Sequence, residues 1–163
     1  MKSFFFILFL ATLLSTLAQV TGSYSNSFGS RITLNADSTF KYKWNFDLAS
    51  SWNTGKWQIM NDTIYLNPVI VYDTLKMNDK KYILRDSLVL SMDEKSETIT
   101  ENEYLSYLLV SGGQSRIAVP TKLLYHQNEL FDFTKESKLL KKKVRIFMNS
   151  KKVVPWYRKS KNH

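Results

Sequence analysis

Residues 39–48, with the sequence TFKYKWNFDL, decide the fold of this chain. Single polar or charged residues separate its five apolar residues, which are Phe40, Tyr42, Trp44, Phe46 and Leu48. A β-strand places all five on one face, whereas an α-helix would spread them around its circumference. The segment therefore predicts a strand with one aromatic face.

The flanking segments repeat this design. Residues 31–34 lead into it through the polar turn-formers at 35–38, and residues 55–60 and 63–67 form the next hairpin. Further strands are predicted at residues 81–85, 87–92, 122–125, 130–133 and 143–148. About seven to nine short strands with local turns predict an all-β fold, an antiparallel meander that closes into a barrel or forms a sandwich.

One segment breaks the strand pattern. Thr100 and Glu103 have the spacing of a helix-capping box, and Gly112 with Gly113 provides a stop signal. We expect one short helix near residues 100–110, with an ordered insertion loop as the alternative.

A family resemblance rests on the hairpin at residues 55–67. Its first strand reads GKWQI from Gly55, and its second reads DTIYL from Asp62. These residues resemble the Gly-x-Trp strand and hairpin of small secreted lipocalin-like bacterial proteins, and the resemblance covers residues 22–67. In true lipocalins the Gly-x-Trp motif lies on the first strand, whereas here it lies on the third or fourth. The resemblance implies a lipocalin-like barrel with a small ligand inside.

Residues 1–18 have the layout of a secretory signal peptide. Lys2 gives a positive start, residues 4–14 are apolar apart from Thr12, and Thr16 and Ala18 place small residues before a cleavage site. We expect cleavage near Ala18 and a secreted or periplasmic protein; an uncleaved N-terminal anchor is the alternative. The chain has no cysteine, so packing alone must stabilise it, which fits a bacterial envelope. No transmembrane segment is expected in the mature chain.

Charge divides the mature chain. Residues 19–134 carry eleven bases and thirteen acids, whereas residues 135–163 carry eleven bases and one acid. We expect a β-barrel domain at 19–134 and a basic C-terminal segment at 135–163 that packs partly on the barrel. The concentrated positive charge indicates an anionic partner or surface. Its candidate anion-binding residues are Lys141, Lys142, Lys143, Arg145, Lys151, Lys152, Arg158 and Lys159.

No catalytic or cofactor-binding pattern is recognisable. The chain has no thiol and only two histidines, His126 and His163, and it lacks phosphate-loop and dinucleotide-binding motifs. Its acids are scattered, so spacing assigns no acid–base pair. We predict no catalytic residues, metal or cofactor and no enzymatic activity, and a hydrolase of unknown type ranks third among the candidate functions.

The aromatic face supplies the candidate ligand site. Tyr42, Trp44, Phe46 and Trp57 would line a cavity if the barrel interior is open, and they would fill it as ordinary core if it is packed shut.

Asp-Ser or Asp-Thr pairs recur at residues 37–38, 62–63, 73–74 and 86–87. Such pairs cap turns by bonding to the nearby backbone. The pattern also resembles a bacterial O-glycosylation acceptor, which is the alternative interpretation.

These features predict an exported, non-catalytic binding protein of the bacterial envelope that holds a small hydrophobic or amphipathic ligand in its barrel. The alternative is an interaction protein that docks on an anionic envelope component through its basic C-terminus while the barrel is closed. A specific nucleic-acid partner is not expected.

Overall fold

The computed structural model describes residues 19–69, 71–78, 80–88, 95–109, 117–146 and 149–160. The expected signal peptide and part of the expected strand at 87–92 lie outside these ranges. The elements are β1 (Gly22–Ser25), β2 (Ser30–Leu34), β3 (Thr39–Phe46), β4 (Ala49–Met60), β5 (Thr63–Val69), β6 (Tyr72–Met77), β7 (Lys80–Leu88), β8 (Thr98–Thr100), α2 (Glu101–Leu109), β9 (Lys122–His126), β10 (Glu129–Asp132), β11 (Val144–Ile146), β12 (Asn149–Val153) and β13 (Tyr157–Lys159).

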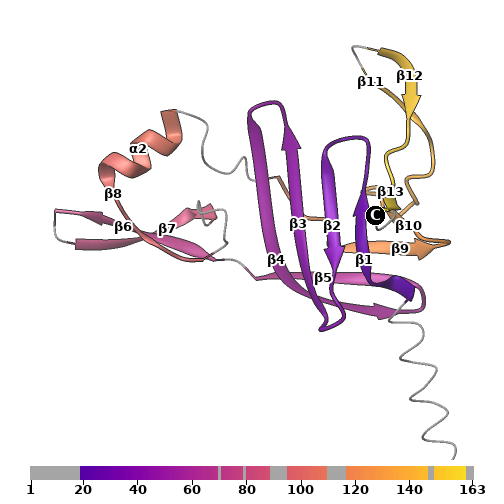
Figure 1. Ribbon diagram of the computed structural model, residues 1–163, viewed down its shortest axis with the longest axis horizontal. Helices are drawn as coiled ribbons and strands as arrows, with labels where there is room; N and C mark the ends of the chain where they lie inside the picture. The colour runs from indigo at the N-terminus through magenta and orange to yellow at the C-terminus, as the bar shows by residue number, and fades with distance from the viewer. Residues whose placement is uncertain are drawn as a thin grey trace, which may run out of the picture.

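Eight of the strands form a closed antiparallel barrel in the order β1-β13-β10-β9-β5-β4-β3-β2 (Figure 1). The chain runs up and down between neighbouring strands and leaves the barrel twice, between β5 and β9 and between β10 and β13. The first and last strands close the cylinder, with Tyr24 opposite Lys159 and Ser25 opposite Arg158. The expected all-β barrel is confirmed.

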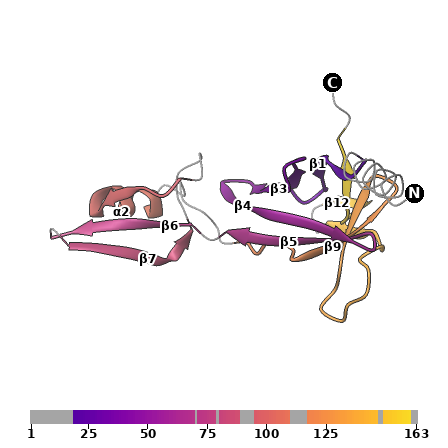
Figure 2. The same ribbon diagram turned by 90° about the horizontal axis from the view of Figure 1, so that it is seen from below.

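The first excursion from the barrel forms a small second unit. Its sheet has the order β7-β6-β8, with β8 parallel to β6, and α2 follows β8 directly. The expected capping box is present, because the Thr100 amide donates to Glu103 Oε2 at 2.7 Å. Leu75 and Ile99 form its core with Tyr104 and Tyr107 packed against them. Figure 2 shows this unit extending from the end of the barrel where β5 finishes.

The second excursion carries most of the basic segment. It includes the antiparallel hairpin β11–β12, in which Arg145 lies opposite Lys152. The chain then returns as β13 to close the barrel. The barrel therefore continues past the expected domain boundary at residue 134, because its closing strand comes from the basic segment. Residues 72–109, which the expected barrel domain included, form the second unit instead.

Side chains fill the barrel interior from one end. Trp57 lies 3% exposed, and its indole N–H donates to the Asn35 carbonyl at 3.0 Å. Val20 lies 2% exposed at the same end, and its carbonyl accepts a hydrogen bond from the Tyr24 hydroxyl at 2.6 Å. The core of the barrel comprises Val20, Tyr24, Ile32, Leu34, Phe40, Tyr42, Trp57, Ile64, Leu66, Leu123, Leu130 and Tyr157.

The glycine of the Gly-x-Trp motif has a packing role. A Cβ on Gly55 would lie 2.7 Å from Cε1 of Phe40 and 2.2 Å from the Asn67 carbonyl oxygen. The absence of a side chain therefore lets the Phe40 ring lie against the backbone of β4.

The aromatic face of residues 39–48 is buried only in part. Phe40 and Tyr42 lie in the core, whereas Phe46 is 66% and Leu48 is 78% exposed. The last registered pair between β2 and β3 joins Ser30 to Trp44, and the Asn45 amide then donates to the Gly29 carbonyl at 3.1 Å. Phe46 therefore lies beyond the end of β2. Strand β3 also ends at Phe46, and Leu48 belongs to the turn before β4.

Candidate functional site

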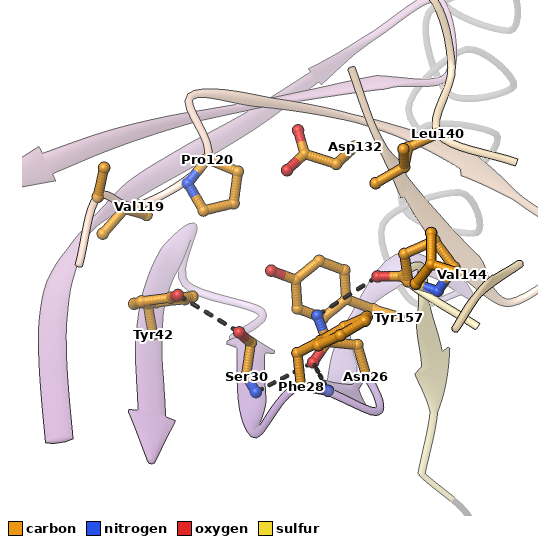
Figure 3. A pocket seen from close by; sticks show the side chains of 12 residues that line it. Asn26, Phe28, Ser30, Tyr42, Val119, Pro120, Asp132, Leu140, Val144 and Tyr157 are labelled. Carbon is orange, nitrogen blue, oxygen red and sulfur yellow. Dashed lines mark hydrogen bonds between the residues drawn. The ribbon is translucent and has the colours of Figure 1, made fainter. Parts of the chain in front are cut away.

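A pocket of about 520 Å³ lies at the other end of the barrel, and Figure 3 shows its lining side chains. We call it the mouth pocket. Its polar lining residues are Asn26, Ser30, Tyr42, Asp132 and Tyr157. Its apolar lining residues are Phe28, Ala118, Val119, Pro120, Leu140, Val144 and Pro155.

Strand alternation directs four polar residues into this pocket. They lie on four different barrel strands and are Ser30, Tyr42, Asp132 and Tyr157. Tyr42 and Tyr157 belong to the core, and Ser30 and Asp132 each lie two residues from a core residue on the same strand. Side chains two apart on a strand share a face, so these four continue the inward face of the barrel. We call them the polar cluster.

The turn between β1 and β2 is fixed by one side chain. Asn26 Oδ1 accepts hydrogen bonds from the Phe28 amide at 2.9 Å and the Ser30 amide at 3.0 Å. Asn26 Nδ2 donates to the Pro155 carbonyl at 3.4 Å. Asn26 therefore joins the two segments that lead into β2 and β13 at the edge of the pocket.

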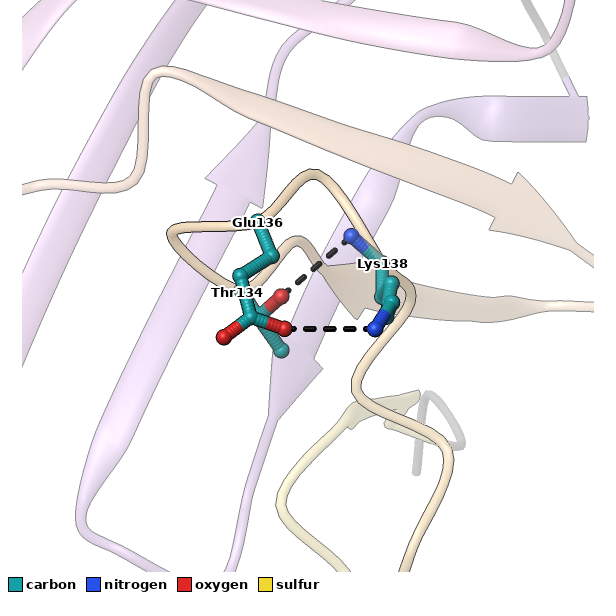
Figure 4. Close-up of polar contacts among 3 residues, drawn as sticks. All are labelled: Thr134, Glu136 and Lys138. Carbon is teal, nitrogen blue, oxygen red and sulfur yellow. Dashed lines mark hydrogen bonds and ion pairs between the residues drawn. The ribbon is translucent and has the colours of Figure 1, made fainter.

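A tight turn follows β10, and Figure 4 shows the polar contacts within it. The Lys138 amide donates to Thr134 Oγ1 at 3.2 Å, and Lys138 Nζ lies 3.3 Å from Glu136 Oε2. The Leu140 amide then donates to the Asp132 carbonyl at 2.8 Å. This bond holds Leu140 beside the polar cluster as part of the apolar wall.

The three hydroxyl-bearing residues of the polar cluster are buried, and Asp132 is half-buried. Ser30, Tyr42 and Tyr157 are 7%, 2% and 4% exposed, and the Ser30 and Tyr42 hydroxyl oxygens lie 3.4 Å apart. Burial raises the pKa of both tyrosines, and the nearby Asp132 carboxyl adds to the effect. Both phenols are therefore neutral donors at neutral pH.

Asp132 supplies the acidic group of the cluster. Burial raises the pKa of its carboxyl, and the Phe133 amide, which donates to Asp132 Oδ1 at 2.7 Å, partly offsets that rise. Half-buried carboxylates accept hydrogen bonds strongly, so this group favours a ligand that carries donors.

The pocket thus has a polar base and an apolar rim. Its hydroxyl-bearing residues are buried, whereas apart from Pro155 its apolar residues are half-buried or exposed. A ligand that fits this arrangement inserts a polar head toward the cluster and leaves an apolar body against Phe28, Leu140 and Val144.

The expected ligand-binding residues are not all brought together. Tyr42 lines the mouth pocket. Trp57 lies in the core near the opposite end, Trp44 packs against the core, and the exposed Phe46 stacks on Trp44 at a centroid distance of 6.3 Å.

Three of the expected anion-binding residues contact a neighbouring group of the protein. Lys141 lies over the Phe131 ring at 5.4 Å, Arg158 pairs with Glu129 at 3.2 Å, and Lys159 Nζ donates to the Gln19 carbonyl at 2.7 Å. Burial lowers the pKa of Lys159. Lys142, Lys143, Arg145 and Lys152 are exposed, and the side chain of Lys151 lies outside the described part.

Sequence reasoning missed Ser30, Asp132 and Tyr157 as site residues. Each occupies an inward position at the pocket end of a strand, and the available signal was a polar residue in phase with apolar ones, as Asp132 is with Leu130. Within the described residues, no group of histidine and acidic side chains is arranged to hold a metal ion. No helix there is long and apolar enough to cross a membrane.

Comparison with protein-family models, curated proteins and solved structures finds no match to this chain.

Proposed function

We propose that this chain is an exported, non-catalytic binding protein of the bacterial envelope that takes a small amphipathic ligand into the mouth pocket, head group first. One observation carries the proposal: a buried cluster of hydroxyls with one carboxyl lies beneath an apolar rim. The volume of about 520 Å³ falls within the range of roughly 300–1,000 Å³ found for small-molecule pockets.

The packed core limits how the ligand enters. Tyr42 and Tyr157 belong to the core, and further core side chains lie beneath them, so an apolar tail has little room to pass deeper. The tail therefore stays at the rim and the head reaches the hydroxyls.

The cluster favours a head group that donates hydrogen bonds. Asp132 accepts from an ammonium or hydroxyl group, whereas a second carboxylate would repel it. An alkyl amine should therefore bind more tightly than the alcohol, and the alcohol more tightly than the acid.

Octylamine, octanol and octanoate provide the test, because they share one chain and differ in the head. Each is titrated against the purified protein at neutral pH while tryptophan fluorescence is recorded. The proposal predicts saturable binding in the order amine, alcohol, acid. Equal affinities, or no saturation with any of the three, would rule it out.

A second candidate function rests on the β11–β12 hairpin. Arg145 and Lys152 are exposed and directly opposite, and the exposed Lys142 and Lys143 precede the hairpin. Such a surface suits docking on an anionic envelope component by charge, which salt screens. Cosedimentation with anionic vesicles at low and high salt tests it: the docking function requires binding that salt abolishes and that Arg145→Gln/Lys152→Gln weakens.

A further inference from the structure

We propose that a hollow on the outer face of the barrel, which adjoins the mouth pocket and shares Asn26 and Ser30 with it, binds a phosphate group through Arg31 and Lys43. The hollow has a volume of about 340 Å³ and lies beside the turn between β1 and β2. Its lining includes Ser25, Asn26 and Asn45 besides the two cations.

The strand register places the two cations side by side. Arg31 on β2 is the direct partner of Lys43 on β3. Both alternate with inward residues, Ile32 and Tyr42, so both side chains project outward. Neighbouring strands lie about 4.8 Å apart, and like charges placed directly opposite each other repel.

The same row of the sheet contains a balanced charge pair for comparison. Arg158 on β13 is registered with Glu129 on β10, and Arg158 Nε lies 3.2 Å from Glu129 Oε1. Ser25 stands between Arg158 and Arg31 in this row. Among the described residues, no carboxylate pairs with Arg31 or Lys43.

The lining supplies the donors that a phosphate needs. A guanidinium binds two phosphate oxygens with parallel hydrogen bonds, and an ammonium adds a second positive charge. The Ser25 hydroxyl and the exposed Asn45 side chain add neutral donors at the edge of the hollow. A bound phosphate would replace the repulsion between the cations with attraction to both.

A matched pair elsewhere in the chain separates this site from general basic charge. Arg145 and Lys152 are also an arginine and a lysine in direct antiparallel register, but they lie on the open β11–β12 hairpin. The double variants Arg31→Gln/Lys43→Gln and Arg145→Gln/Lys152→Gln therefore lose the same charge from the same type of pair.

Calorimetric titration with inorganic phosphate at low salt tests the site. Wild type and the Arg145→Gln/Lys152→Gln variant should bind with one affinity, and Arg31→Gln/Lys43→Gln should bind at least about tenfold more weakly. Equal weakening by both variants, or no saturable binding by wild type, overturns the proposal. Thermal unfolding confirms that both variants are folded.

Two further ligands identify the source of the phosphate. Glycerol phosphate and vesicles with phosphatidic acid are each tested for binding to wild type and to Arg31→Gln/Lys43→Gln. If the variant binds both ligands more weakly than wild type does, the site accepts a lipid headgroup. If the variant binds only glycerol phosphate more weakly, the site takes free phosphate esters. If it binds neither more weakly, a phosphate ester is not its ligand and the proposal fails. Neither cation lines the mouth pocket, so the Arg31→Gln/Lys43→Gln variant leaves the lining side chains of that pocket unchanged, and a failure of this proposal is distinguishable from a failure of the proposed function.

Discussion

The hydroxyl oxygens of Ser30 and Tyr42 lie 3.4 Å apart at the boundary between the packed core of the barrel and the mouth pocket. Below them the interior is filled with apolar side chains, and above them the lining is a mixture of polar and apolar groups. This boundary determines the direction in which an amphipathic ligand would enter.

Removal of the Tyr42 hydroxyl should weaken ligand binding with little effect on the fold. Tyr42→Phe keeps the ring in the core and deletes one donor, so octylamine should bind about fivefold more weakly, as expected for one lost hydrogen bond. Tyr82→Phe is the matched control, because Tyr82 is 48% exposed on β7 in the second unit. If both variants bind like wild type, Tyr42 does not contact the ligand.

Asp132 should give ligand binding a pH dependence. Burial raises the pKa of this carboxyl above its usual value of 3.8. Below the raised pKa the group is neutral and attracts an ammonium less, so octylamine affinity should fall as the pH drops through that range. In Asp132→Asn the affinity for octylamine should no longer fall as the pH drops through this range. Octylamine titrations of wild type and the variant over a series of pH values measure the difference.

The same group should affect stability in the opposite direction. The folded protein holds the proton of Asp132 more tightly than the unfolded chain, so its contribution to stability falls as pH rises from 3.8 through the raised pKa. Asparagine does not titrate, so the variant lacks this loss. Relative to wild type, the free energy of unfolding of Asp132→Asn should therefore be higher at neutral pH than in acid. Urea unfolding at both pH values checks the sign, and a reversed trend would contradict the burial argument.

Substitution of Gly55 should destabilise the barrel. In Gly55→Ala the new methyl group would meet the Asn67 carbonyl and the Phe40 ring, and only the ring can move aside. Overpacking of this kind costs about 1–3 kcal/mol, and the fixed backbone contact favours the upper end. Urea unfolding measures the change. Ser50→Ala, on the same strand but half-buried away from this contact, should stay within about 0.5 kcal/mol of wild type.

Export should produce a chain that begins at Gln19. Val20 lies in the core, and the Gln19 carbonyl accepts from Lys159 Nζ, so processing near Ala18 would keep both contacts. Mass spectrometry of the exported protein should give a mass that begins at Gln19. Cleavage three residues later would remove Val20 and cost roughly 2 kcal/mol, so a mature N-terminus at Gly22 would contradict the prediction.

The sequence was sufficient to predict the strands around residues 31–67 and the capped helix, but it missed β1, β6, β8, β12 and β13. The separate strands expected at 81–85 and 87–92 are one strand, β7, as far as these residues are described. The alternation of apolar and polar side chains over residues 39–44 correctly identifies which face of β3 points into the barrel. It does so because burial of one face of a strand requires an apolar residue at every second position. Thr100 and Glu103 are close in sequence, so local hydrogen bonding alone fixes their geometry.

Other features depended on contacts distant in sequence. Closure through β1 and β13 joins Tyr24 to Lys159, and no local pattern around Tyr157 distinguishes a closing strand from an extended tail. Phe46 continues the alternation but is exposed, because the shorter β2 ends before it. The position of Asp132 in the pocket likewise depends on where β10 ends relative to β2 and β3.

The central claim is that an amphiphile binds with its head at the polar cluster, and side-chain and amide NMR spectra recorded during an octylamine titration test it most directly. The account predicts saturable shifts concentrated at Ser30, Tyr42, Asp132 and Tyr157, with smaller shifts at Leu140 and Val144. Shifts confined to the exposed leucines of α2, Leu105, Leu108 and Leu109, would contradict it, because they would place the amphiphile on the second unit instead of in the barrel.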